Sequence, residues 1–563
     1  MRRLAVVLAL VSCSSPKSPP RASATDGDVP ARFEDLTAYV ANHLHRTEPH
    51  EAVSLGLHKH DGQLPDLTPA GIADQIKLFQ RDLAALDAAR ELTPGQEVER
   101  EVLRAALRVR LFRLVDLDVY RTNPMAYAPF INLDAYILRD YAPAPTRAAA
   151  VVKLCTALPA FLAQARTNLE PPLVRTFVDT ALLQTKGYIE FADKDVRAAL
   201  ANQPELDPAL DRCKAALTEH AAWLTKQQAT ATDRFPLGEA TFLKMLADTQ
   251  GVETDLARLT AIAEADLQRN LAALDEAARA IDPSKSTADV VAQLAQERPT
   301  PETVLDVATQ QAATMRQFVI DHHIASIPSD DVALVRESPP FQRWNSAFLD
   351  SAGPFETTKL PSFYYISPPD PAWPVAEQLA YLPPTADLLF TTIHEVYPGH
   401  FLQRLHIANH PSRVMQSFCT YSNNEGWAHY VEEMMFDAGA GGQTPRARVG
   451  MLKEALLRNA RFVATIGLHT GGLTVEAATK LFAEKGFVDA GNARQQAVRG
   501  TFDPMYLAYT IGKLMIRNLR ADWLKANPGK TLGDFHDALL GYACAPIPVI
   551  RRAMLGPDAG SPI

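Results

Sequence analysis

The sequence lacks long runs of basic or of apolar residues. Lys and Arg number 56 against 65 Asp and Glu, a net charge of −9, and no block of Lys or Arg exceeds a few residues. A nucleic-acid partner is therefore not expected. Beyond the N-terminus, no segment has the roughly 18 uninterrupted apolar residues that a membrane-spanning helix requires. With 47% hydrophobic and 21% charged residues, the composition is typical of a globular protein and excludes a chain that is disordered over its whole length.

Cysteine is scarce, with five residues in the chain. One of them is Cys13; the other four are separated by gaps of 58, 206 and 125 residues and are Cys155, Cys213, Cys419 and Cys544. An even number permits disulfides in an exported protein, but these gaps form neither a disulfide framework nor a metal-binding motif. We expect the four to be buried free thiols.

The N-terminus has the pattern of a secretory signal, with Arg2 and Arg3 before an apolar stretch at 4–11. Leu10-Val11-Ser12-Cys13 resembles the lipobox of bacterial lipoproteins. The resemblance implies a signal peptide over residues 1–12, lipidation of Cys13 as a membrane anchor, and a place in the cell envelope, facing the periplasm and compatible with the outer membrane. Ser, Pro and Ala enrich the segment that follows, so 13–30 reads as a flexible tether. The alternative is an ordinary signal with a free cysteine.

Helical periodicity dominates the rest of the chain, and segments that favour strands are few. Apolar residues recur close to every 3.6 positions over 96–121, 207–230, 241–281 and 302–324. Short runs rich in β-forming residues occur at 332–335 and 362–366. We therefore predict a mainly helical protein with a small β element. A break near 283–300 separates an N-terminal helical lobe, 31–283, from a C-terminal lobe, 284–563, that carries most of the chemistry.

The strongest motif is His394-Glu395-Val396-Tyr397-Pro398-Gly399-His400. Two histidines beside a glutamate on a helix are typical of zinc hydrolases, in which the imidazoles bind the metal and the glutamate is the general base. The usual spacing between the histidines is four residues; a gap of six leaves the two rings about 120° apart on an ideal helix. Because proline lacks an N–H and glycine adopts conformations closed to other residues, a kink between 397 and 400 would return the second histidine to the metal.

A third ligand is required, and Glu425 is the candidate. It follows His400 by 25 residues, enough for a loop and a return on an antiparallel helix. His429 lies one turn later on the same face, so it suits a supporting role behind the ligands or an alternative ligand. Ser422 and Glu425 also fit a capping box, in which the glutamate only closes a helix N-terminus.

The His-Glu-x-x-Pro-Gly-His motif followed by Glu-Gly-Trp-Ala resembles the bacterial family named domain of unknown function 885, over most of residues 31–555. Residues 51–61, with His58, His60 and Asp61, resemble its N-terminal signature. The family is grouped with zinc metallopeptidases of the gluzincin type. The resemblance thus implies zinc held by His394, His400 and Glu425, with Glu395 as general base. It also implies a helical fold around a deep cleft that admits short peptides. The sequence departs from the usual pattern of the family at Phe401, Thr465 and 503–509, and these departures leave the substrate preference open.

The residues that would assist catalysis are less clearly marked. Tyr509 is the first candidate for the donor that stabilises the oxyanion, and His469 is the second. Either residue could instead be a structural one, with its polar group hydrogen-bonded inside a helical core. The strand at 362–366, with Tyr364 and Tyr365, could pair with an extended substrate or be an ordinary buried strand.

A peptide C-terminus would need a cation to meet its carboxylate. The sequence offers four for that role, each of which could equally be a surface charge: Arg461, Arg499, Lys513 and Arg517.

The resulting hypothesis is a zinc-dependent peptidase that hydrolyses short peptides in the bacterial envelope. One alternative is a catalytically inactive helical lipoprotein that binds peptides or a protein partner. Another is a zinc hydrolase of non-peptide amides, because the motif chemistry fits either bond. The sequence does not indicate an oligomeric state or a physiological substrate.

Overall fold

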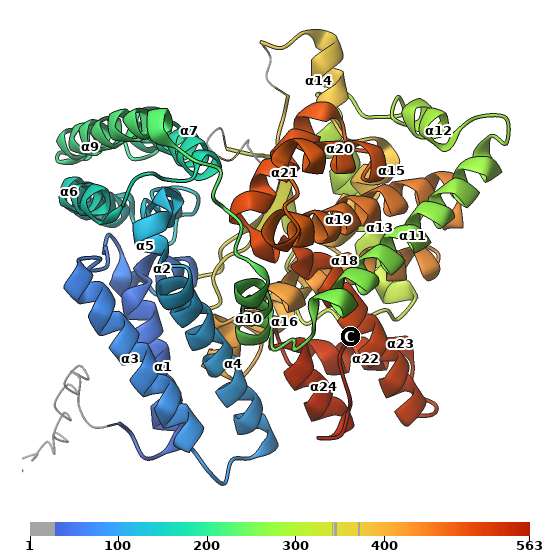
Figure 1. The fold of residues 1–563 in the computed structure, drawn as a ribbon, viewed down its shortest axis with the longest axis horizontal. Helices are drawn as coiled ribbons and strands as arrows, with labels where there is room; N and C mark the ends of the chain where they lie inside the picture. The colour runs from blue at the N-terminus through green and yellow to red at the C-terminus, as the bar shows by residue number, and fades with distance from the viewer. Residues whose placement is uncertain (1–28, 340–341, 343–345, 370–371) are drawn as a thin grey trace, which may run out of the picture.

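The computed structural model describes residues 29–339, 342, 346–369 and 372–563. The predicted signal peptide, Cys13 and nearly all of the tether lie outside these residues. The fold is mainly helical with one small sheet, as the sequence predicts, and Figure 1 shows α1 to α9 grouped on one side of the view and the helices from α11 onward on the other.

The N-terminal helices begin at well-defined caps. At the start of α4, the Thr93 hydroxyl accepts from the N–H of Gln96 while the Gln96 side chain accepts from the N–H of Thr93, and Pro94 occupies the first helical position. The helices are α1 (Phe33–Thr47), α2 (Pro49–Ser54), α3 (Pro69–Ala88), α4 (Pro94–Leu111), α5 (Val119–Thr122), α6 (Ala144–Asn168), α7 (Arg175–Phe191), α8 (Arg197–Ala199) and α9 (Leu206–Gln227).

The periodic segment at 241–281 forms two helices, because Gly251 has a φ of +68° and ends the first of them. Here lie α10 (Glu239–Gln250), α11 (Leu256–Ile281), α12 (Thr287–Leu294) and α13 (Val304–Asp321). The sequence places a division near residue 283, but α11 packs along α19 of the C-terminal half. This helix therefore joins the C-terminal group.

The C-terminal helices surround the predicted motifs. They are α14 (Val375–Tyr381), α15 (Thr385–Glu395), α16 (His400–Ala408), α17 (Arg413–Ser417), α18 (Tyr421–Asp437), α19 (Pro445–Thr470), α20 (Val475–Lys485), α21 (Ala490–Phe502), α22 (Ala508–Ala526), α23 (Leu532–Leu540) and α24 (Ile547–Leu555). α18 packs closely on both α15 and α22.

The sheet consists of β1 (Ala333–Glu337), β2 (Ala347–Asp350) and β3 (Ser362–Ile366) in the order β1-β3-β2. β3 pairs with β1 in parallel and with β2 in antiparallel fashion. Both edges of β3 are therefore occupied, and the strand that the sequence offers for pairing with substrate is a central one. β2, which the sequence analysis did not find, lies at an edge of the sheet.

Two of the four cysteines expected as free thiols form a disulfide, Cys419–Cys544, so that expectation is wrong for this pair. The two residues are 125 positions apart but adjoin in space, because the segment before α18 lies beside the segment after α23 and Thr420 N–H donates to Cys544 C=O at 3.1 Å. Cys155 and Cys213 are free and buried, as expected.

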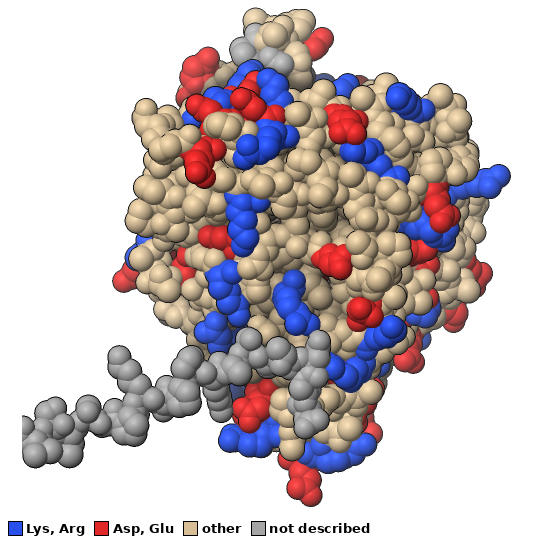
Figure 2. All heavy atoms as spheres, turned by 90° about the vertical axis from the view of Figure 1, so that its left-hand side faces the viewer, with Lys and Arg blue, Asp and Glu red and all other residues tan. Residues whose placement is uncertain are grey.

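One helix among the described residues, α6, is long and apolar enough to cross a membrane by length and composition alone. Half of the most apolar 18-residue stretch of α6 is buried within the fold, where the helix packs against α9. The core helix of a globular fold passes the same test. The face shown in Figure 2 carries basic and acidic side chains mixed together, with wide uncharged areas between them.

Candidate metal centre

The chain leaves its helical path between the two histidines of the central motif. α15 ends at Glu395 and α16 begins at His400. At Gly399 a Cβ atom would lie 1.8 Å from the carbonyl oxygen of His394, so no other residue fits without a shift of the backbone. The predicted kink is present. The glycine is required by this close approach rather than by a positive φ, since its φ is −69°.

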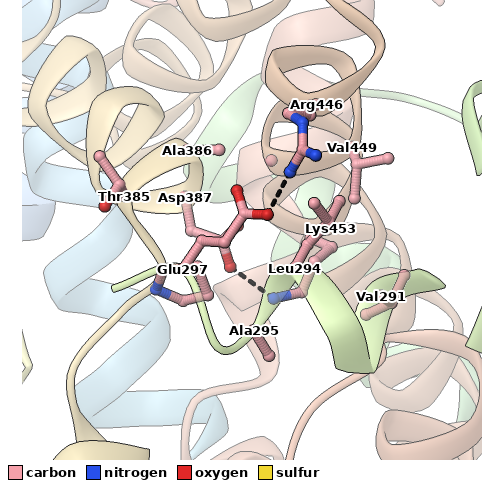
Figure 3. A pocket seen from close by; sticks show the side chains of 12 residues that line it. Val291, Leu294, Ala295, Glu297, Thr385, Ala386, Asp387, Arg446, Val449 and Lys453 are labelled. Carbon is pink, nitrogen blue, oxygen red and sulfur yellow. Dashed lines mark hydrogen bonds and ion pairs between the residues drawn. The ribbon is translucent and has the colours of Figure 1, made fainter. Parts of the chain in front are cut away.

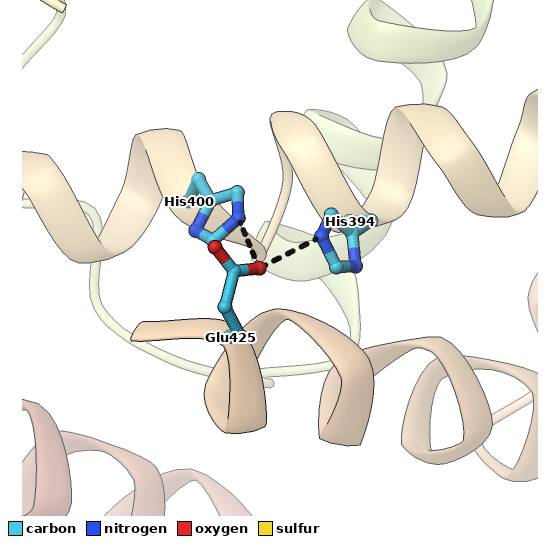
Figure 4. Close-up of side chains that lie close together, drawn as sticks. All are labelled: His394, His400 and Glu425. Carbon is cyan, nitrogen blue, oxygen red and sulfur yellow. Dashed lines mark ion pairs between the residues drawn. The ribbon is translucent and has the colours of Figure 1, made fainter. Parts of the chain in front are cut away.

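His394, His400 and Glu425 meet in space, with one ligand atom from each lying within 4.8 Å of the others. Glu425 Oε2 lies 3.6 Å from His394 Nε2 and 3.3 Å from His400 Nε2 (Figure 4). Burial alone would raise the pKa of Glu425, but the two imidazoles lower it well below its usual value. Two imidazole nitrogens and one carboxylate form a donor set that can hold a metal ion, and catalytic zinc sites use such sets.

The capping-box alternative for Glu425 is not formed. Ser422 lies within α18, and Thr420, which precedes the helix, makes no side-chain capping bond. α18 brings Glu425 to the histidines as a returning helix, as the spacing predicts.

Glu432, to which the sequence assigned no role, contacts the candidate ligand His394. His394 Nδ1 donates to Glu432 Oε1 at 2.6 Å, which leaves Nε2 facing Glu425. His429 Nδ1 donates to Glu432 Oε2 at 3.0 Å, so His429 contacts the supporting carboxylate instead of a ligand. Arg458 lies 3.3 Å from Glu432 Oε1 and balances its charge. Glu432 follows Glu425 by seven residues, or two helical turns, so the sequence spacing indicates that both carboxylates lie on the same face of the helix.

Glu395 is buried beside the two histidines and is held by the edge strand. Its Oε2 accepts a hydrogen bond of 2.9 Å from the N–H of Leu349 on β2. Burial raises the pKa of Glu395, and the nearby His400 and His394 partly counteract this rise. The Leu349 N–H thus points away from β3, and the outer edge of β2 faces the candidate metal centre.

Tyr509 reaches the site from α22. The crossing of α18 and α22 is very close, because a Cβ on Gly426 would lie 2.5 Å from the Cα of Gly512. This contact places Tyr509, one turn before Gly512, near Glu425. Its ring is nearly parallel to that of His394, with 6.2 Å between the centres. Burial and the charge of Glu425 raise the pKa of Tyr509.

His469 does not join this group. Its Nε2 donates to the carbonyl of Gly500 at 2.8 Å, and its ring stacks on Phe242 with centres 6.1 Å apart. These contacts place His469 in the core between α10, α19 and α21, which favours the structural alternative for this residue.

The cations proposed for a substrate carboxylate differ in their partners. Lys513 is fully buried, 3.4 Å from Asp266 and 3.3 Å from Glu433, so it belongs to an internal ion network. Arg517 also pairs with Glu433. Arg499 pairs with Asp503 at 2.9 Å. Arg461, in contrast, forms a hydrogen bond only with the amide of Gln496 among the described residues.

The two tyrosines of β3 are both buried. The Tyr364 hydroxyl lies 3.3 Å from that of Thr392 on α15, so it ties the sheet to the helix that carries His394. Tyr365 packs against Phe348 and Phe363, and these contacts account for both side chains without a substrate.

A separate cavity lies at the N-terminal end of α15, at the opposite end of the helix from His394. Its charged lining side chains pair with one another, Asp387 with Lys453 and Glu297 with Arg446 (Figure 3). This mutual pairing leaves the cavity without a free charge among those four residues.

The chain is similar in fold to two bacterial proteins of known structure. One is a candidate lipoprotein of unknown function from Shewanella oneidensis, with a TM-score of 0.79 and 22% identity over 93% of this chain and 100% of that one. The other is a candidate lipoprotein from Colwellia psychrerythraea, with a TM-score of 0.72 and 15% identity over 93% of this chain and 98% of that one.

An M32 carboxypeptidase from Deinococcus radiodurans R1 has a TM-score of 0.41 and 14% identity, over 94% of this chain and 97% of that one. No curated protein matches the sequence. The family model described as bacterial protein of unknown function (DUF885) matches residues 49–554, nearly the whole chain beyond the N-terminus. The chain therefore belongs to the DUF885 family.

Proposed function

We propose that this protein is a zinc-dependent peptidase that hydrolyses short peptides in the bacterial envelope. The observation that carries the proposal is the convergence of His394, His400 and Glu425 beside the buried Glu395. A structural metal site has no use for the extra carboxylate, whereas a hydrolytic site needs one as a base. Zinc held by the three residues would supply a Lewis acid for attack of water on a carbonyl.

Glu395 is the general base in this scheme. Its carboxylate would accept the proton of the attacking water and pass it to the nitrogen of the leaving amine. The hydrogen bond from Leu349 N–H occupies Oε2 and fixes the direction of the carboxylate, leaving Oε1 for the proton.

Tyr509 is the proposed donor to the oxygen that becomes negative when the carbonyl is attacked. The residue lies beside His394 and Glu425, and its hydroxyl has no hydrogen-bond partner among the residues described. A donor that is free in the resting protein is available to the transition state.

The outer edge of β2 is the proposed guide for the substrate backbone. An extended peptide adds to an open strand edge through main-chain hydrogen bonds. β2 replaces the strand at 362–366 in this role, because β2 lies at an edge of the sheet in the described part of the chain and contacts Glu395 directly.

A lipid anchor on Cys13 would hold the enzyme at the membrane. The signal and lipobox at 1–13 support this location, and the two proteins of similar fold are themselves described as candidate lipoproteins.

The test is the metal content of purified residues 14–563 by mass spectrometry, followed by a screen of short peptides. We expect about one zinc per chain, its loss in Glu425→Ala, and its retention in a control, Glu253→Ala, at an exposed position. Absence of stoichiometric zinc after metal is supplied and dialysed away would overturn the proposal in favour of an inactive binding lipoprotein. If the protein binds zinc but cleaves only non-peptide amides, the proposed metal site would stand and the proposed substrate class would be wrong.

A further inference from the structure

Among the residues that the structure describes, Arg461 is a buried cation without an anionic partner. Its side chain lies on α19 and the residue is 7% exposed. Nε donates to Gln496 Oε1 at 2.9 Å, and no carboxylate lies within ion-pairing distance in the described part of the chain. Arg458, one turn earlier, contacts both Glu432 and Glu454. Burial of a charge is unfavourable unless it is paired, so the isolation of Arg461 requires an explanation.

The surroundings of Arg461 are positively charged. Burial and the neighbouring guanidinium of Arg499 lower the pKa of Arg461. Asp503 lies 2.9 Å from Arg499 and offsets the charge of Arg499, but not that of Arg461. Arg499 Nη2 also donates to the Tyr421 hydroxyl at 3.0 Å. The two arginines and Asp503 together leave one positive charge uncompensated, which an anion would balance.

This charge lies close to the candidate metal centre. The guanidinium carbon of Arg461 is 4.8 Å from the centre of the Tyr509 ring, and that centre is 6.2 Å from the His394 ring. The guanidinium therefore lies no more than 11.0 Å from the His394 ring, the sum of these two distances.

A substrate can span this separation. One extended residue covers about 3.6 Å, and an arginine nitrogen contacts a carboxylate oxygen at about 2.8 Å. A peptide whose carbonyl is attacked at the metal centre would thus bring a carboxylate to Arg461 from one or two residues beyond the scissile bond.

We propose that Arg461 binds a carboxylate of the substrate, located one or two residues to the C-terminal side of the bond that is cleaved. The inference rests on the proposed peptidase function and adds the substrate class: peptides that end in, or carry, a carboxylate near this bond. The source is either the free C-terminus, which would make the enzyme a carboxypeptidase, or an acidic side chain. Arginine suits the role because its planar group binds a carboxylate through two parallel hydrogen bonds.

Binding can be measured separately from turnover in zinc-supplied Glu395→Gln protein by calorimetry. The probes are trialanine with a free C-terminus, trialanine amide, and the amide of Ala-Ala-Asp. We expect the free acid to bind about 10- to 100-fold more tightly than trialanine amide. Tight binding of the Ala-Ala-Asp amide as well would assign the carboxylate to a side chain and would equally support the inference.

Variants locate the effect. Arg461→Gln should remove the preference for the acid while leaving the affinity for trialanine amide unchanged, and Arg461→Lys should retain part of it. The control is Arg448→Gln on the same helix, whose arginine pairs with Glu276 at 2.9 Å. Thermal melting of each variant establishes folding.

The comparison of acid and amide in the parent protein does not depend on any variant at Arg461. Equal affinity for the three probes, with peptide cleavage by the active enzyme, would overturn this inference alone. Failure to bind or cleave any of them would overturn the proposed function as well.

Discussion

Leu349 on β2 donates its backbone N–H to Glu395 Oε2 at 2.9 Å, and this contact joins the edge strand to the glutamate of the central motif. The strand is held in turn by β3, whose Tyr364 hydroxyl lies 3.3 Å from Thr392 on the helix that carries His394. The sheet and α15 therefore fix one another. A peptide aligned along β2 would lie at a constant distance from the candidate base, as proximity effects in catalysis require.

The first prediction concerns Glu395→Gln. The amide is close in shape to the carboxylate and can still accept from Leu349 N–H, but it cannot take up the proton of the attacking water. Peptide cleavage should fall by at least about 100-fold, while zinc content stays near that of the parent protein. Single-turnover assays and metal analysis on the same preparation give both quantities. Substantial residual activity in a protein free of parent enzyme would contradict the role of Glu395.

The second prediction concerns Glu432→Gln. Loss of this charged acceptor weakens the orientation of His394, and such changes typically reduce metal affinity by about 10- to 100-fold. Competition with a chelator measures the affinity. Glu454→Gln is the matched control, because Glu454 also contacts Arg458 but not a ligand. Equal affinity in the two variants would show that Glu432 acts on stability alone.

The three candidate ligands could be identified from the sequence because their signal is local. His394 and His400 belong to one short motif, and Glu425 follows at a spacing that one helix turnaround explains. Glu432 carries the same kind of signal, a carboxylate two turns after Glu425 on the same face, and could have been found.

Other parts of the site leave no such trace. Leu349 contributes only its backbone N–H, which every residue except proline possesses, and it lies 46 positions before Glu395. Cys419 and Cys544 are adjacent only in the folded chain. The choice between Tyr509 and His469 depends on how closely α18 and α22 cross, which the glycines at 426 and 512 determine.

A third prediction tests the break between α15 and α16. In Gly399→Ala the new methyl group would overlap the His394 carbonyl, so the backbone must shift and the two histidines separate. We expect a loss of stability of about 1–3 kcal/mol together with weaker zinc binding, measured by thermal melting and chelator competition. Gly95→Ala is the control, since a Cβ at Gly95 contacts nothing within 4 Å. A zinc affinity equal to that of the control would contradict the argument.

The disulfide supports a fourth prediction. Cys419–Cys544 closes a loop of 125 residues that contains Glu425, and a crosslink of this kind typically contributes about 2–4 kcal/mol. Reductant should therefore lower the melting temperature of the parent protein. The double variant Cys419→Ser, Cys544→Ser should melt at the lower temperature and show no further response. A parent protein insensitive to reductant under denaturing and refolding cycles would mean that the bond contributes nothing to stability.

The last prediction uses His58, from the N-terminal segment that resembles the family signature. His58 Nδ1 lies 3.0 Å from Asp61, and Nε2 lies 3.1 Å from Glu356, in the loop that joins β2 to β3. Burial alone would lower the pKa of His58, but its hydrogen bonds to the two carboxylates raise it to about 9. The segment thus fastens the loop behind the edge strand through a charged imidazole.

Because the folded state raises this pKa, the added stability is complete below the unfolded value, about 6.5, and is lost as the pH rises through 9. After allowance for solvent screening, the change amounts to about 1–2 kcal/mol. Urea midpoints measured from pH 6 to 9.5 should fall in the parent protein and fall less in His58→Gln, which cannot titrate. Glu356→Gln should lie between them, since Asp61 remains. Parallel pH curves for the parent and His58→Gln would show that the imidazole is neutral and does not clamp the loop.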